Sequence, residues 1–172
     1  MTRPKSDFDA LRDDLRKVYD GDPWHGSSIR DVLKGVDADT AALKSIPNAH
    51  SIWELVLHMT GWTREVASRV RGADAKSPPE DWPAPRTSGG EAAWRSAQGE
   101  LAAAHKDLEK AVDSLKPEDL LRWIGEQRDP ALGTGLTVGT VIRGLLQHHT
   151  YHQGQIALLK RAAEARTRLR GV

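Results

Sequence analysis

The sequence predicts an all-α protein built as a four-helix bundle. Four segments carry apolar residues at steps of three and four, the spacing that places side chains on one face of a helix. Each stripe is narrow, which is typical of helices that bury one seam against their neighbours. No stretch alternates apolar and polar residues for long enough to indicate a strand. A chain of 172 residues has the usual size of one domain, so we expect residues 1–172 to share one core.

The first two helices are separated by a long connection. The first seam, Phe8–Val18, ends before Gly21-Asp22-Pro23, where proline cannot continue a helix. From Gly26 to Pro47 we expect loop, apart from a short helix around residues 39–44. The second seam is Ile52–Val66.

The last two helices follow a proline-rich segment. Ser77–Pro85 contains four prolines and must therefore be irregular, since each proline disfavours helical backbone in the residue before it. The third seam, Trp94–Leu115, closes before Pro117, and proline suits the first position of a further short helical turn. Thr137 is the predicted N-cap of the fourth helix, whose seam is Val138–Leu159. The long second and third connections indicate crossovers between the helices.

Composition narrows the class of protein. The 25 Lys and Arg against 24 Asp and Glu give a net charge of +1, which argues against a dedicated nucleic-acid binder. No apolar run approaches the roughly 18 residues of a membrane span, and the N-terminus lacks the apolar stretch of a secretory signal. We therefore expect a cytoplasmic protein without a nucleic-acid or membrane partner. The absence of cysteine excludes disulfides, thiolate metal sites and a thiol nucleophile of the chain's own.

Histidines lie on the inner faces of two predicted helices. At 100° per residue, His58 lies within about 60° of the second seam, as do His148, His149 and His152 of the fourth. Several imidazoles inside one bundle each need a partner, and a metal ion suits them all. His148 and His152 have the i, i+4 spacing of helical zinc pairs. His149 with His152 would reach a metal nearly as well, and His105 in the third seam is a rival ligand, so the periodicity leaves these choices open.

Two of these segments also resemble a known family. Residues 144–156, GLLQHHTYHQGQI, resemble the final-helix signature of the DinB/YfiT-like superfamily. Residues 50–62, HSIWELVLHMTGW, resemble the second helix of that family, which supplies one histidine. The earlier PWHG of residues 23–26 is similar to family loops, and the similarity extends from about Phe8 to Arg161.

The resemblance implies a particular set of ligands and a particular fold. Carried over position by position, it assigns a divalent metal ion to His58, His148 and His152, with zinc or nickel as the expected metal. It leaves His149 as a pocket residue or as a partner of a ligand. It also implies helices arranged up-down-down-up, and a homodimer.

Four more residues are candidates for lining the pocket or orienting a ligand: His50, His25, Tyr151 and Gln155. His50 lies two turns before His58 at the start of its helix, and His25 belongs to the loop that resembles the family. Tyr151 and Gln155 are part of the final-helix signature.

The resemblance implies a metal-dependent enzyme without singling out a catalytic side chain. Relatives include S-transferases that use a low-molecular-weight thiol, bacillithiol or mycothiol, so we expect such an S-transferase or a hydrolase acting on a small molecule. Because the chain has no cysteine, a reacting thiol would come from a cosubstrate. The alternative is a non-catalytic dimeric bundle that binds a metal, a small ligand or a partner protein.

Overall fold

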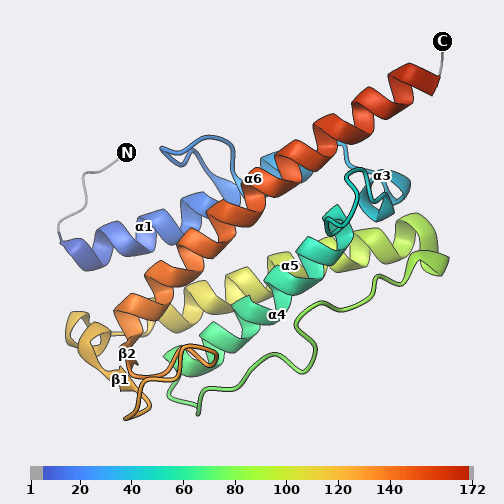
Figure 1. Cartoon of the computed structure of the whole chain (residues 1–172). Coiled ribbons are helices and arrows are strands. Elements are labelled where there is room, and N and C mark those ends of the chain that lie inside the picture. The colour runs from blue at the N-terminus through green and yellow to red at the C-terminus, as the bar shows by residue number, and fades with distance from the viewer. Residues whose placement is uncertain (1–5, 171–172) are drawn as a thin grey trace.

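Four long helices form the body of the molecule across residues 6–170, the part of the chain that this computed structural model describes (Figure 1). They are α1 (Asp7–Asp20), α4 (Ile52–Val70), α5 (Gly90–Asp113) and α6 (Val138–Arg170). Helices α1 and α6 run in one direction, and α4 and α5 run in the other, which is the up-down-down-up arrangement. Each helix coincides with one predicted seam, so the predicted all-α four-helix bundle is confirmed.

Short elements occupy the connections. They are α2 (Ile29–Leu33), α3 (Ala38–Ala42), the 3₁₀ turns η1 (Thr87–Gly89) and η2 (Pro117–Leu121), and the strands β1 (Trp123–Ile124) and β2 (Leu136–Thr137). The strands pair antiparallel, and at two residues each they are too short to show an alternating pattern. The short helix expected around residues 39–44 overlaps α3, and the turn expected at Pro117 is η2.

The prediction of loop at residues 29–33 is wrong. Ser28 and Asp31 form a reciprocal cap at the start of α2, in which each side chain accepts a hydrogen bond from the other residue's backbone N–H. Ile29 and Leu33, one turn apart, are both buried against the bundle. Its apolar residues Ile29, Val32 and Leu33 span little more than one turn, too short a stretch for periodicity to stand out, so tertiary packing and the cap stabilise this helix.

The ends of the site-bearing helices are fixed by side chains. At the start of α4, Ser51 Oγ accepts from the backbone N–H of Glu54 at 3.2 Å, and Glu54 Oε2 accepts from the backbone N–H of Ser51 at 2.6 Å. At the start of α6, Thr137 Oγ1 accepts from the backbone N–H of Thr140 at 3.3 Å, which confirms Thr137 as the N-cap.

The core has two parts along the length of the bundle. One surrounds the tilted pair Trp53 and Trp94, whose rings are 5.3 Å apart, and Trp94 Nε1 donates to the carbonyl of Val36 at 2.7 Å. The other joins the ends of α1, α4, α5 and α6 through residues such as Leu15 and Leu108. Within residues 6–170, no helix has the length and apolar character needed to cross a membrane.

Leu101→Ala should destabilise the protein by about 2–5 kcal/mol, because Leu101 is fully buried in the core and its truncation leaves a cavity. Leu158→Ala is the matched control on a helix surface, since Leu158 is 57% exposed, and it should change stability by less than about 0.5 kcal/mol. Urea unfolding of both variants measures the difference. Equal effects would contradict this assignment of the core.

Candidate metal centre

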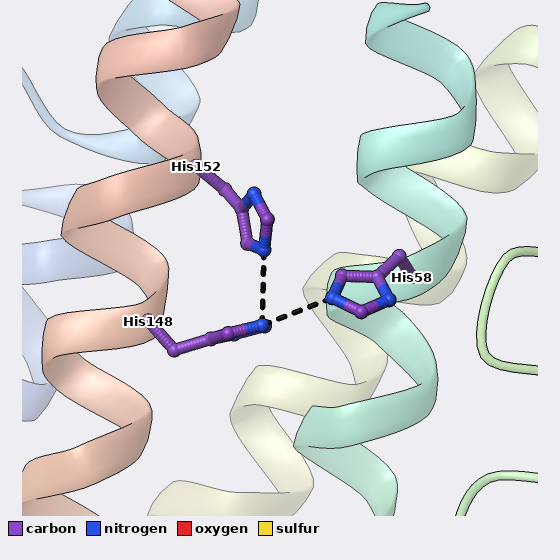
Figure 2. A group of neighbouring side chains, drawn as sticks. All are labelled: His58, His148 and His152. Atoms are coloured by element: carbon purple, nitrogen blue, oxygen red, sulfur yellow. Dashed lines mark hydrogen bonds between the residues drawn. The ribbon is translucent and has the colours of Figure 1, made fainter. Parts of the chain in front are cut away.

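Three histidines from two helices point at one another in the interior of the bundle (Figure 2). His58 comes from α4, and His148 and His152 come from successive turns of α6. The Nε2 atom of His148 lies 3.0 Å from Nε2 of His58 and 3.0 Å from Nε2 of His152. His58 and His152 are buried, and His148 is partly buried. The residues that the resemblance selects therefore form one cluster.

The outer nitrogens of two of these rings fix their tautomers. His58 Nδ1 lies 2.6 Å from the backbone carbonyl oxygen of Asp81, which can only accept, so Nδ1 carries the proton. In the same way His152 Nδ1 donates to Gln155 Oε1 at 2.6 Å. Both rings therefore present an unprotonated Nε2 towards His148. Metal-ligating histidines typically show this arrangement, in which an oxygen acceptor orients each ring.

His148 cannot satisfy both neighbours by hydrogen bonding. If its proton is on Nε2, one N–H faces two lone pairs and Nδ1 is left without a proton. Nδ1 of His148 is buried and has no hydrogen-bond partner among the described residues. If the proton is on Nδ1 instead, three lone pairs face one another with no donor between them. Either tautomer leaves buried polar atoms unsatisfied, which is costly, whereas a cation at the centre would satisfy all three Nε2 atoms.

The donor set fits a divalent ion. A tetrahedral zinc ion with Zn–N bonds of about 2.0–2.1 Å holds its ligand nitrogens roughly 3.3 Å apart. Two of the three pairs here are 3.0 Å apart, and all three atoms lie within 4.8 Å of one another. Burial, with the neighbouring histidines, lowers the pKa of His148 to about 4. Burial also lowers the pKa of His152. These two rings are thus neutral at neutral pH, which is the form that binds metals. The cluster is compatible with a metal site.

The proline-rich connection between α4 and α5 packs against the cluster. The Trp82 indole lies parallel to the His58 ring with centroids 3.9 Å apart, and it also lies parallel to His50 at 3.5 Å. The neighbouring Asp81 accepts a hydrogen bond from Trp62 Nε1 at 2.8 Å through Oδ1, which is also 3.2 Å from His58 Nδ1. The sequence pattern does not indicate Asp81 or Trp82, because an irregular segment has no period; a tryptophan among prolines is the one signal it offers.

A buried arginine anchors this connection. Arg69 of α4 is 2% exposed and donates from Nε to Glu65 at 2.9 Å and from Nη2 to the carbonyl of Lys76 at 2.8 Å. Its Nη1 donates to the carbonyl of Leu132 in the loop between β1 and β2. One side chain thus ties two loops to the helix that carries His58.

The structure separates His149 and His105 from the cluster. His149 is fully buried, and its Nε2 donates to Thr63 Oγ1 at 3.1 Å, since that hydroxyl itself donates to the carbonyl of Met59. His105 Nε2 donates to the carbonyl of Leu15 at 2.9 Å. Among the described residues, the group that could hold a metal is therefore His58, His148 and His152.

The other candidate residues lie at different distances from the cluster. Gln155 contacts His152 directly, and His50 reaches the cluster through Trp82. Tyr151 is 64% exposed, with its ring 5.1 Å from that of His152. His25 is exposed on the loop after α1, where its Nε2 lies 3.4 Å from Thr150 Oγ1. It lines a separate surface hollow together with Tyr151.

Comparison with known proteins gives one match. A family model described as the DinB superfamily matches residues 24–156, a span that includes all three histidines of the cluster. Searches of curated proteins and of solved structures gave no significant match.

In metal-free protein, His58 and His152 should both carry their ring proton on Nδ1, because Nδ1 of each faces an oxygen acceptor. Long-range ¹H–¹⁵N spectra of ¹⁵N-histidine-labelled protein distinguish the two tautomers. His149 is the internal control, since its bond to Thr63 places the proton on Nε2. A proton on Nε2 of His58 would contradict the described orientation of that ring.

Proposed function

The chain belongs to the DinB superfamily, and on that premise we propose that it is a metal-dependent enzyme that binds one divalent ion, zinc or nickel. The ligands are His58, His148 and His152. The observation that carries the proposal is the convergence of three Nε2 atoms whose lone pairs no arrangement of protons satisfies. Three protein ligands are also the number found in catalytic zinc sites, which keep a further position for water or substrate.

The ion would supply Lewis acidity to a water molecule or to the thiol of a cosubstrate. The protein's own residues hold the imidazoles in place: the Asp81 carbonyl and Gln155 accept from the outer nitrogens, and Trp82 covers one ring. We propose hydrolysis, or transfer of a small-molecule thiol, as the reaction. The chain contains no cysteine to act as a nucleophile itself, which is consistent with either reaction.

Cobalt substitution tests this proposal. Wild-type protein should take up about one cobalt per chain, and azide or a small thiol should change its visible spectrum, because a three-histidine site has an open position. His58→Ala should take up none, and the exposed His25→Ala should behave as wild type.

Equal cobalt uptake by His58→Ala and wild type would contradict the assignment of the site. Stoichiometric uptake with a spectrum that neither azide nor thiol alters would instead favour a non-catalytic metal-binding bundle.

Gln155→Leu should lower zinc affinity by about 10–100-fold, because His152 Nδ1 would lose its acceptor. Gln147→Leu is the control, since Gln147 is exposed on the same helix. A competition titration against a chromophoric chelator measures both affinities. If the two variants bind zinc equally well, the hydrogen bond from His152 to Gln155 does not contribute to zinc affinity.

A further inference from the structure

A cavity of about 640 Å³ opens directly beside the histidine cluster. His58 of α4 and His148 of α6 form part of its wall, so it adjoins two of the three candidate ligands. Gly133 and Leu136, from the segment before α6, also line it. Its volume lies in the range that holds a small organic molecule.

The wall of this cavity is mostly apolar. Side chains from α4, β2 and α6 contribute apolar surface: Trp62, Val66, Leu136, Val141 and Leu145. Three charged residues also line it. Arg69 is engaged with Glu65 and two backbone carbonyls, and Asp81 with Trp62 and His58. Arg143 is exposed on α6. An occupant therefore meets apolar surface close to the cluster and gains most by burying an apolar group.

A glycine keeps the cavity open one turn from His148. Gly144 lies four residues before His148, so both positions are on the same face of α6. A Cβ at Gly144 would meet no atom within 4 Å, whereas a Cβ at Gly61 of α4 would lie 3.3 Å from Pro78. Close packing thus accounts for Gly61 and not for Gly144. A Cβ at Gly99 of α5 would also meet no atom within 4 Å, so what distinguishes Gly144 is that it lines the cavity.

We propose that this cavity binds the apolar portion, of aryl or branched-alkyl size, of a substrate whose polar end reaches the histidine cluster. Gly144 determines the size of group that fits, because any side chain at this position would project into the space beside His148. The inference rests on the proposed metal-dependent function and adds the chemical class of its substrate.

Two hydroxamates test the inference on the zinc-loaded full chain. Acetohydroxamate and benzohydroxamate share a zinc-binding head and differ in carrying a methyl or a phenyl group. Isothermal titration calorimetry gives the ratio of their affinities. In wild-type protein, benzohydroxamate should bind about tenfold more tightly or better, because the phenyl group is buried in the cavity. In Gly144→Leu this advantage should vanish, while zinc content and acetohydroxamate affinity stay close to those of wild type.

The matched control is Gly99→Leu, which places the same side chain at an exposed glycine inside α5 where a Cβ also meets no atom within 4 Å. It should keep the wild-type ratio of affinities. Gly144→Ala adds one carbon and provides a second variant in case Gly144→Leu loses its zinc. It should show a smaller loss of the preference for benzohydroxamate than Gly144→Leu.

The outcomes separate this inference from the function on which it rests. If wild-type protein binds zinc but the ratio of affinities is the same in wild type, Gly144→Ala and Gly144→Leu, the cavity is not the apolar subsite and only this inference fails. If wild-type protein takes up no zinc, the proposed function fails, and this inference fails with it.

Discussion

The mutual approach of three imidazole nitrogens is the constraint on which the rest of this structure depends. Two Nε2–Nε2 distances of 3.0 Å inside a helical bundle are unfavourable for neutral rings that share too few protons. The bundle nevertheless brings α4 and α6 together at this point and fixes two of the rings from outside, through the Asp81 carbonyl and Gln155. A cation of suitable size turns this cost into binding energy, which is why the arrangement indicates a metal site more strongly than the presence of histidine alone.

The connection between α4 and α5 also helps to hold the histidine cluster in place. A bundle needs only a link between these parallel helices, and the chain uses that link to place Asp81 and Trp82 against His58. Arg69 ties the link to α4, and its hydrogen bonds satisfy a charge that burial would otherwise make costly. Loops positioned by a rigid scaffold often carry binding residues, and this one places two residues against His58.

The sequence predicts the helices well and the site only in part. Four apolar seams determine the long helices because each repeats over several turns, whereas the apolar residues of α2 span little more than one turn. Helical angles place both His148 and His149 beside the seam, so periodicity could not choose between them. The choice depends on what lies opposite: Thr63 faces His149, and His58 faces His148. Asp81 reaches His58 through a backbone carbonyl, a role that any residue type could fill and that no motif reveals.

The central claim is that a divalent ion occupies the point where the three Nε2 atoms meet. The most direct measurement is an anomalous diffraction map at the zinc edge, from crystals of untagged protein purified without a metal column and soaked in zinc. The account predicts one strong peak within bonding distance of His58, His148 and His152. A map with no peak there, or with zinc bound only at surface histidines such as His25, would contradict it.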